Sequence, residues 1–590
     1  MEMRMSTELR RARQRQMIIF LLVCAVVFAL LARLFYWQIL ESYSGYRLAA
    51  QANAEHVQNQ IIPAPRGHIY DVDGRLLATN VVRDDVYIEP IQFTSDHPDN
   101  YQADLQVQVA ALHGVLPALS EESLLQAFGS GRPTVRIAGP IEPEQSEKLR
   151  KMRLPDTFLE PRPWRVYPNN DLAAQMLGYV QESAGQTRGI YGLEAKYDQL
   201  LAGKPGNFTA ETDLMGNPLT VGTSSGSSAI SGADLTVTVK SDVQQIVQSS
   251  LAETVQQMGA QSGTALVLNA QTGAIVAMAG YPAFDPNDYG NYADQKGCLG
   301  QQEVYYNPAL YCAYEPGSTM KAITMAAALD QKLITPEQTI QDPGYLDFPD
   351  GTPTVTNWER QGYGTESMTQ VLEHSANVGA AYVAYNVLGP DRFYPYLQRF
   401  GFGTKTGLLS PETGGGYRTP SSQGWTKSDM VRQSFGQSIT ATPLQIARAY
   451  QAIANGGVMM QPYLVSQIVK NGQVQTIQPR VEQRVISAEA AKQLTGMLVS
   501  AANANQQATI PGYSVAVKTG TATTQGLAED QTEASMAGFL PASQPRFVIL
   551  VKLDRPQNQI YGGTAAGPLW KTIAQQLMAI DEVPPDLPLH

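Results

Sequence analysis

The chain has 590 residues, of which 43% are hydrophobic and 16% charged. It is too long for one compact core and too apolar for a disordered chain, so two or three folded domains are expected. The formal net charge of −11 argues against a nucleic-acid partner, because a surface that binds phosphates needs clustered positive charge. The six histidines are scattered and no His/Cys spacing resembles a zinc site, so neither a metal nor another cofactor is predicted.

An apolar stretch near the N-terminus predicts a transmembrane helix. Residues 17–32 are sixteen unbroken apolar positions, and the apolar character resumes after Arg33 and runs to Leu40, giving 24 positions against the roughly 20 needed to cross a bilayer. Five arginines precede it: Arg4, Arg10, Arg11, Arg13 and Arg15. The positive-inside rule therefore predicts a cytoplasmic tail at 1–16, a single-pass anchor in the plasma membrane at 17–40, and an extracytoplasmic remainder. A cleaved signal peptide is the alternative, but no small-x-small cleavage site directly follows the run.

The three cysteines fall into two groups. Cys24 lies in the predicted span, whereas Cys298 and Cys312 lie 14 positions apart in the extracytoplasmic part. In an oxidising compartment this second pair could form a disulfide, which would constrain the loop by about 3 kcal/mol. Spacing alone does not decide the pairing, so both states stay open.

Residues 41–230 predict an irregular α+β module. Short strand-like runs at 67–72 and 86–89 are mixed with an amphipathic stretch at 102–119 and several proline-rich turns. A Gly/Ser-rich segment at 221–232 then interrupts all periodicity, which predicts a flexible connector or an exposed loop. We expect the domain boundary there.

Residues 231–580 show a more regular pattern and predict a second domain, followed by a short tail at 581–590. Strand patterns occur at both ends of this domain and helix patterns between them, which indicates a sheet assembled from distant segments. The expected strands are 235–239, 263–269, 274–279, 513–517, 535–540 and 547–554, and the expected helices are 241–258, 318–329, 368–388, 443–455 and 568–580.

A serine and a lysine three residues apart form the sharpest local signal. Ser318 follows a Pro-Gly pair at the start of a strongly helix-forming run, so we expect it in the first helical turn with Lys321 on the same face. Such a turn presents a nucleophile and a base together, provided that burial or a neighbouring positive charge keeps Lys321 neutral part of the time. By itself, the pattern could equally be a helix-capping serine followed by a solvated lysine.

Two further motifs agree with that signal. Ser375 and Asn377 can shuttle a proton and hold a substrate amide, although an ordinary polar loop has the same composition. Lys518-Thr519-Gly520-Thr521 follows a β-prone run. On an edge strand, Gly520 would let a peptide approach closely, Lys518 and Thr519 could hold its carboxylate, and the Thr521 amide could face an oxyanion. A second Lys-Thr-Gly, at 405–407, lacks a preceding strand and is interpreted as loop.

The three motifs in this order resemble the penicillin-recognising serine acyl-transferases. Four further segments are similar to the pedestal and catalytic-domain motifs of class B penicillin-binding proteins: 63–74, 165–168, 189–194 and 434–437. The resemblance implies an α+β fold, in which a transpeptidase domain with an antiparallel sheet, flanking helices and a helical subdomain stands behind an irregular α+β pedestal and one transmembrane helix.

The resemblance also implies the reaction, a D,D-transpeptidation of peptidoglycan stem peptides that β-lactam antibiotics would inhibit. Ser318 would attack the penultimate D-alanine, Lys321 would deprotonate it, and Ser375 would relay a proton with Lys518. Asn377 would hold the substrate amide, Lys518 and Thr519 would orient the terminal carboxylate, and the backbone amides of Ser318 and Thr521 would stabilise the oxyanion. The cytoplasmic membrane and a membrane glycosyltransferase are the implied partners.

Some positions depart from the family pattern or invite a specific test. Val517 stands where glycine is usual and could narrow the floor of the cleft. Val72-Asp73 replaces a common Arg-Asn pair in the pedestal. Arg66 and Glu194 are candidates for an ion pair that joins two pedestal segments, with an exposed and weak pair as the alternative.

Two other functions share these motifs. A β-lactamase or D,D-carboxypeptidase would hydrolyse the same acyl-enzyme, but a β-lactamase needs neither the anchor nor the long N-terminal module. A catalytically silent scaffold would use the same fold to hold a glycosyltransferase, but it would not need intact motifs. Within the transpeptidases, residues 314–317 and 434–437 look closer to division-type than to elongation-type members.

Overall fold

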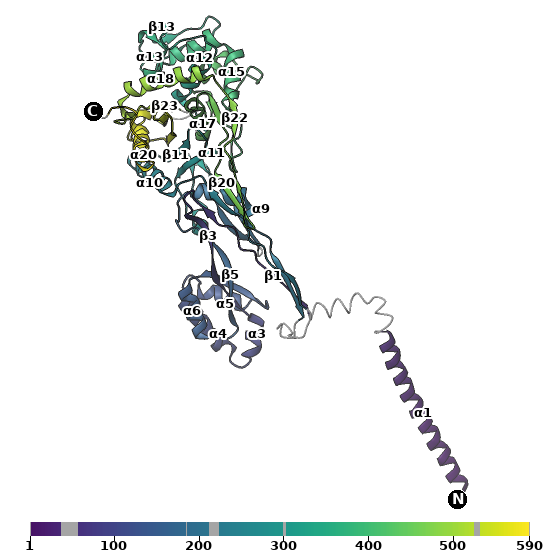
Figure 1. The fold of residues 1–590 in the computed structure, drawn as a ribbon. Coiled ribbons are helices and arrows are strands. Elements are labelled where there is room, and N and C mark those ends of the chain that lie inside the picture. Colours follow the sequence, from purple (N-terminus) through teal and green to yellow (C-terminus); the bar gives the residue numbers. More distant parts are fainter. Residues whose placement is uncertain are drawn as a thin grey trace. The chain divides into compact units, whose positions relative to one another are not determined.

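The computed structural model describes residues 2–36, 57–183, 186–211, 224–298, 302–523 and 531–588, which form two compact units (Figure 1). The first unit comprises residues 1–64 and 204–230, and the second comprises 65–203 and 231–590.

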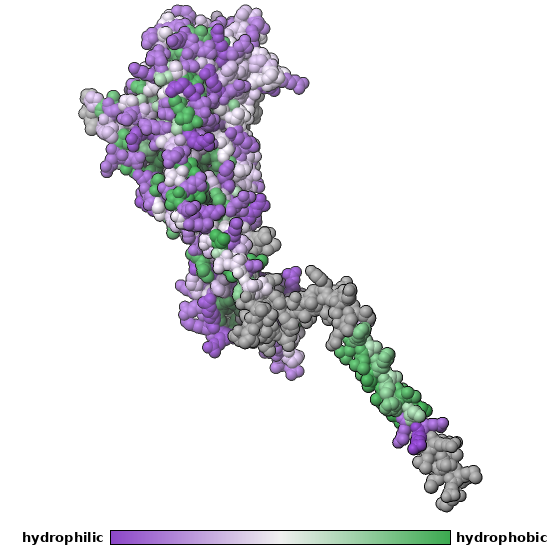
Figure 2. Space-filling model, turned by 45° about the vertical axis from the view of Figure 1, so that its right-hand side comes forward, coloured by the Kyte–Doolittle hydropathy of each residue, from purple (hydrophilic) through white to green (hydrophobic). Residues whose placement is uncertain are grey.

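The first unit holds a long helix and a small sheet. Helix α1 (Glu2–Phe35) contains Arg13–Phe35, a segment long and apolar enough to cross a membrane, and its apolar side chains form a continuous hydrophobic surface (Figure 2). The last expected positions of the span, 37–40, lie outside the described residues.

The sheet of the first unit corrects one expectation. Strands β1 (Val57–Ile62), β8 (Gly206–Glu211) and β9 (Ser224–Ser227) pair in that order, all antiparallel. The Gly/Ser-rich segment expected as a connector is therefore a strand over four of its residues, while 221–223 lie outside the described part. A Cβ atom on Gly226 would lie 2.4 Å from the Asn207 carbonyl oxygen, so the missing side chain allows this close pairing.

The second unit begins with strands and helices of the pedestal. Strand β2 (Ile69–Tyr70) and the long β3 (Leu76–Ile88) pair with each other, and β3 pairs further with β4 (Val135–Ile141) and β5 (Thr157–Val166). The amphipathic stretch expected at 102–119 forms α4 (Tyr101–Val115). It packs beside α3 (Pro90–Asp96), α5 (Glu121–Phe128) and α6 (Pro143–Met152) around a separate small core.

One sheet crosses the sequence boundary between the two expected domains. Strand β10 (Asp234–Val237) pairs on one side with β2 and on the other with β20 (Val465–Lys470), which pairs in turn with β21 (Gln473–Thr476). The order β21-β20-β10-β2-β3-β4 therefore joins strands of the pedestal to strands of the catalytic half by backbone hydrogen bonds.

A five-stranded antiparallel sheet forms the centre of the catalytic half. Its order is β12-β11-β25-β24-β23, with β11 (Ser262–Asn269), β12 (Ile275–Tyr281), β23 (Ala516–Thr523), β24 (Thr532–Leu540) and β25 (Phe547–Asp554). Strands far apart in the chain lie side by side, as the sequence pattern predicts. Strand β23 forms an edge of the sheet and carries residues 518–521, as expected for the motif, but it begins at Ala516 and not at residue 513.

Helices cover both faces of this sheet. On β11, Ala265 and Val267 pack into a core with α10 (Ser241–Met258) and α20 (Gly567–Ile580), whereas Leu266 and Leu268 face the opposite core. That opposite core contains α12 (Met320–Asp330), α17 (Pro443–Ala454) and α18 (Ala488–Ala504). Burial on both faces explains why the inner strands β11 and β25 contain continuous hydrophobic runs instead of an alternating pattern.

Two expected helices differ from the structure near the motifs. The α-helix expected from Ser318 begins only at Met320, because Gly317–Thr319 forms a 3-10 turn. The helix expected over 368–388 is divided into α13 (Met368–Glu373), α14 (Asn377–Tyr382) and a π-helical turn at Val383–Leu388. The division occurs at Ser375, whose φ of 56° lies in the left-handed region and cannot continue a right-handed helix.

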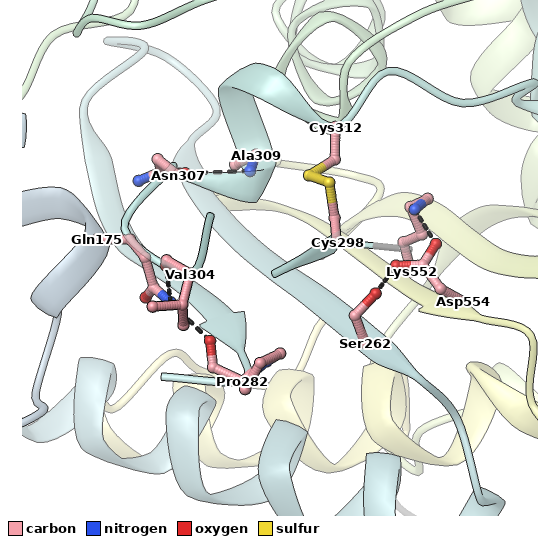
Figure 3. The surroundings of a disulfide bond; sticks show 10 residues. All are labelled: Gln175, Ser262, Pro282, Cys298, Val304, Asn307, Ala309, Cys312, Lys552 and Asp554. Carbon is pink, nitrogen blue, oxygen red and sulfur yellow. Dashed lines mark hydrogen bonds and ion pairs between the residues drawn. A yellow bond between two sulfur atoms is a disulfide. The ribbon is translucent and has the colours of Figure 1, made fainter. Parts of the chain in front are cut away.

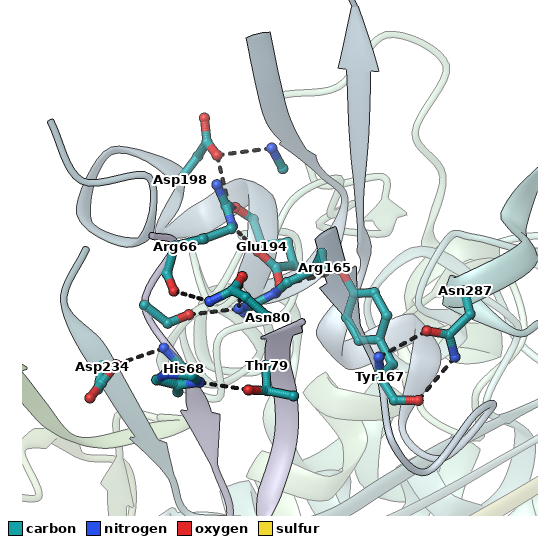
Figure 4. A network of polar contacts seen from close by, with 12 residues as sticks. Arg66, His68, Thr79, Asn80, Arg165, Tyr167, Glu194, Asp198, Asp234 and Asn287 are labelled. Carbon is teal, nitrogen blue, oxygen red and sulfur yellow. Dashed lines mark hydrogen bonds and ion pairs between the residues drawn. The ribbon is translucent and has the colours of Figure 1, made fainter. Parts of the chain in front are cut away.

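The predicted ion pair of the pedestal exists, but it is buried and has more members. The Glu194 carboxylate accepts from Arg66 Nε and from Arg165 Nε, each at 2.7 Å, and Arg66 also contacts Asp198 at 2.8 Å (Figure 4). Glu194 is 0% exposed. Burial by itself raises the pKa of Glu194, but the charges of Arg165 and Arg66 outweigh it and lower the pKa below its usual value. The pair is therefore not the weak surface pair held as the alternative.

Replacing Glu194 tests this network. We expect Glu194→Gln to lower the free energy of unfolding by about 3–5 kcal/mol, because two buried guanidinium groups lose their counter-charge. Arg66→Glu combined with Glu194→Arg should not restore stability, since the new arginine would face Arg165. The measurement is denaturant unfolding of the purified full chain.

Glu147→Gln serves as the matched control. Its partner Lys151 and Glu147 itself are 73% and 67% exposed, so this change should cost less than about 1 kcal/mol. An equal loss of unfolding free energy in Glu194→Gln and Glu147→Gln would contradict the buried network.

Candidate active site

The turn that carries Ser318 is held by close backbone contacts. Gly317 has a φ of 56° and its N–H donates to the Gly436 carbonyl at 3.1 Å. A Cβ atom on Gly436 would lie 2.1 Å from the Gly317 oxygen, and one on Gly317 would lie 2.8 Å from the Thr521 oxygen. Only glycines allow segment 434–437 and strand β23 to approach the turn this closely.

Side chains fix the same turn from the core. Tyr450 donates from its hydroxyl to the Thr319 carbonyl at 3.0 Å, and Thr324 Oγ1 donates to the Ser434 carbonyl at 2.8 Å. Ser318 itself is half-buried and lies in the wall of a cleft of about 500 Å³. Its hydroxyl is therefore accessible on an otherwise rigid support.

Lys321 projects from the first turn of α12 into a closed polar site. It is 0% exposed, and its Nζ donates to the Ser375 carbonyl, to Asn377 Oδ1 at 2.8 Å and to Ser375 Oγ at 3.3 Å. Burial and then the nearby charge of Lys518 hold the pKa of Lys321 well below its usual range, and the negative charge of Glu366 opposes them only in part. This lysine meets the requirement for a neutral amine that can act as a base.

Lys518 reaches the same hydroxyl from the edge strand. Its Nζ donates to Ser375 Oγ at 3.0 Å and to the Thr519 carbonyl at 3.3 Å. Burial lowers the pKa of Lys518 to about 7. Ser375 Oγ therefore lies between two amino groups that come from positions 197 residues apart, 321 and 518.

The cleft brings together most of the residues that the sequence predicts. Its lining includes Ser318, Ser375, Asn377, Lys518, Thr519 and Thr521. Gly520 is different, because it is buried and does not line the cleft. A Cβ atom there would lie 2.5 Å from Ser535 Oγ and 2.7 Å from the Pro316 carbonyl oxygen, so its small size serves the packing of β23 against the Ser318 turn.

The second Lys-Thr-Gly lies outside the cleft, in agreement with its interpretation as a loop. Lys405 is exposed, and the backbone N–H groups of Thr406 and Gly407 donate to the Glu412 carboxylate at 2.6 and 2.7 Å. These residues stabilise a local turn.

The open question of the cysteines is answered by a disulfide between Cys298 and Cys312 (Figure 3). Both cysteines are buried, and Cys312 lies six residues before Ser318. Between Cys312 and Ser318, Tyr314 exchanges two backbone hydrogen bonds with Ala441, at 3.0 and 2.9 Å. The segment that leads to the nucleophile is thus fixed covalently and by backbone pairing.

Comparison with known proteins agrees with this geometry. Residues 263–578 match the model of the penicillin-binding protein transpeptidase domain, and residues 61–237 match the penicillin-binding protein dimerisation domain. The chain belongs to the class B penicillin-binding proteins. The penicillin-binding protein PbpB of Mycobacterium tuberculosis is 31% identical over 567 residues, which cover 91% of this chain and 81% of that protein. The peptidoglycan D,D-transpeptidase FtsI of Escherichia coli is 27% identical, with 96% and 92% covered.

Solved structures give the same assignment. Penicillin-binding protein 3 of Mycobacterium tuberculosis, complexed with aztreonam, is 27% identical with a TM-score of 0.66, covering 90% of this chain and 99% of that one. A peptidoglycan synthetase from Bifidobacterium adolescentis is 25% identical with a TM-score of 0.70, covering 90% and 98%.

This penicillin-binding protein has cleft residues that its motifs do not reveal. Trp358 and Tyr561 are 56% and 48% exposed, and their ring centroids lie 5.6 Å apart. Glu373, His374 and Gln437 also line the cleft. The three that stand beside a motif could have been suspected from that position, but Trp358 and Tyr561 lie in segments without any periodic or motif signal.

Lys321 and Lys518 carry like charges, so replacing Lys518 should change the pH dependence of acylation. Lys518→Ala removes a positive charge near Lys321, so the pKa of Lys321 should rise and fewer molecules should carry the neutral base at a given pH. We expect the rising limb of the pH dependence of acylation by a β-lactam to move to higher pH. At a fixed pH on that limb, the rate should fall about tenfold when the pKa of Lys321 rises by about one.

Lys518→Arg is the control, because it keeps the charge at this position. An Ala variant whose rising limb coincides with that of the Arg variant would show that the charge of Lys518 does not tune Lys321.

Proposed function

We propose that this protein is a peptidoglycan D,D-transpeptidase that forms peptide cross-links through an acyl-enzyme on Ser318. The observation that carries the proposal is the cleft that Ser318, Ser375 and Lys518 line together, with Ser375 hydrogen-bonded both to Lys518 and to the buried Lys321. Relatives named D,D-transpeptidase and a relative's complex with aztreonam support the reaction class and β-lactams as inhibitors.

The site residues divide the first half of the reaction between them. Lys321, whose pKa is lowered by burial and by the charge of Lys518, takes the proton of Ser318 as the Ser318 oxygen attacks the carbonyl of the penultimate D-alanine. Ser375, which contacts both lysines, passes a proton to the departing D-alanine amine. The acyl-enzyme then transfers its acyl group to an amine on a neighbouring strand.

The remaining residues hold the substrate. Asn377 is proposed to bind the substrate amide, and Lys518 and Thr519 the terminal carboxylate. The backbone N–H groups of Ser318 and Thr521 are proposed as the oxyanion hole, since both residues line the cleft and their turns pack against each other through Gly317. Gly520 contributes through packing.

We further propose an extracytoplasmic catalytic part, with residues 1–16 in the cytoplasm. The arginines that precede the apolar span and the disulfide between Cys298 and Cys312 support this topology, because disulfides persist in oxidising compartments. A membrane glycosyltransferase is the proposed partner, since cross-linking requires newly polymerised strands. The domain boundary near residue 230 remains part of this proposal.

Covalent labelling tests the reaction. A fluorescent penicillin should label the full chain, and Ser318→Ala should abolish the label because no other residue is proposed to form the acyl bond. Ser249→Ala, on the exposed side of α10, should label like the wild type. A labelled Ser318→Ala variant would overturn the proposal, and an unlabelled but folded wild type would favour the silent scaffold.

The stability of the adduct separates the enzyme classes. A chromogenic cephalosporin should give about one turnover per molecule and then a stable adduct. Rapid continuing turnover would assign a β-lactamase instead.

The similarity to PbpB and FtsI supports a role in division. A fluorescently tagged copy should therefore gather at midcell before constriction. Uniform distribution along the side wall would assign it to elongation.

A further inference from the structure

His374, directly before Ser375, is not used in the reaction described so far although it lines the same cleft as Ser318. It lies at the C-terminal end of α13, and its side chain is 36% exposed. Its imidazole can accept a proton through a ring nitrogen, and it shares the cleft with Ser318 and Ser375.

A buried carboxylate orients the ring. His374 Nδ1 lies 3.1 Å from Glu366 Oε2, and Glu366 is 1% exposed. The ring also stacks on Tyr363, with centroids 4.4 Å apart and planes tilted by 22°. Glu366 stands on β16 (Gly364–Ser367), paired with β13 (Thr339–Asp342), so the orienting group belongs to a rigid strand pair.

The tautomer inferred for His374 is the one in which Nδ1 donates to Glu366. When Nδ1 donates to a carboxylate, Nε2 of a neutral imidazole keeps its lone pair. Among the residues that the structure describes, Nε2 makes no hydrogen bond, and the side chain remains 36% exposed. A carboxylate–imidazole pair with a free basic nitrogen is the arrangement of a general base.

Several charged groups surround this pair. Asp342, buried beside Glu366, binds Asn357 Nδ2 at 2.7 Å. Burial, and then Asp342, raise the pKa of Glu366 to about 7, against the hydrogen bond from His374. Lys321, Lys518, Glu373 and Tyr363 are the other titratable groups of this region.

The second half of transpeptidation requires such a base. An aliphatic acceptor amine has a pKa of about 10 and arrives as an ammonium ion, which cannot attack. Lys321 is needed to return a proton to Ser318 Oγ as the acyl bond breaks, so another group has to take the first proton of the ammonium ion. Resting on the proposed transpeptidase function, we infer that His374, oriented by Glu366, is the general base that deprotonates the acceptor amine.

The step balances without any further reagent. The acceptor ammonium loses one proton to His374 Nε2, and the resulting amine attacks the acyl carbonyl. The C–N bond forms and the bond between the carbonyl carbon and Ser318 Oγ breaks. The second amine proton passes through Lys321 to Ser318 Oγ, and His374 releases its proton to solvent through its exposed edge.

The two half-reactions can be measured separately. Acylation is followed with a fluorescent penicillin, and aminolysis with a thioester donor and a short peptide whose acceptor is a lysine ε-amine. At pH 7, His374→Gln should lower the aminolysis rate about 100-fold and change acylation by less than about twofold. Glu366→Gln should lower aminolysis about 10-fold, because it leaves the imidazole without its orienting charge.

The pH dependence distinguishes a base from a structural support. As the pH rises toward 10, the acceptor deprotonates by itself, so the rate of His374→Gln should approach that of the wild type. A merely structural role would give a deficit that is constant with pH, or an equal loss of acylation through displacement of Ser375. Either result would overturn the inference.

A matched histidine variant and the acylation of the wild type separate the role of His374 from the proposed function. His97→Gln makes the same exchange outside the cleft, at the end of α3, and should leave both half-reactions unchanged. Wild-type protein that is not acylated at Ser318 would refute the proposed function. Normal acylation together with unchanged aminolysis in His374→Gln would refute only the role of His374.

Discussion

Two buried lysines share one serine hydroxyl, and the chemistry of this protein depends on that constraint. Lys321 and Lys518 are 0% and 4% exposed, and both contact Ser375 Oγ. Two ammonium groups that contact the same hydroxyl repel each other strongly in a medium of low polarity, and burial already disfavours each charge. The site therefore favours the neutral form of Lys321. A lysine is ordinarily protonated, but in this neutral form it can act as a base.

The fold supplies this burial by placing the motifs on elements that cannot move independently. Lys518 lies on β23, which pairs with β24 at the edge of a sheet that helices cover on both faces. The Ser318 turn packs against this strand through Gly317 and Gly520, where any side chain would clash with backbone. Ser375 lies at a break between two short helices, in a left-handed conformation that turns its carbonyl and hydroxyl toward Lys321. The strain of that conformation is placed at the reacting centre.

The polar groups outside the catalytic centre serve two distinct purposes. In the pedestal, Glu194 neutralises Arg66 and Arg165 where no ligand could bind, so this network joins segments of chain. Beside the cleft, Glu366 contacts His374 with one ring edge still exposed, so the same kind of contact orients a group that can react. Exposure, rather than the charges themselves, separates a structural ion pair from a catalytic one.

The fold class, the order of the motifs and most elements could be predicted from the sequence, because those properties follow from local periodicity and from residues near one another in the chain. The predicted bounds of helix α10 and strand β25 are the observed ones, whereas Ser318 lies in a 3-10 turn before the helix that carries Lys321. The folded chain was needed to show that Lys518 and Lys321 meet at Ser375 Oγ, that Gly520 serves packing, that Cys298 bonds to Cys312, and that His374 contacts Glu366. Each of these is a contact between distant segments, and burial, which sets the pKa of a lysine or the strength of an ion pair, exists only once those segments have packed.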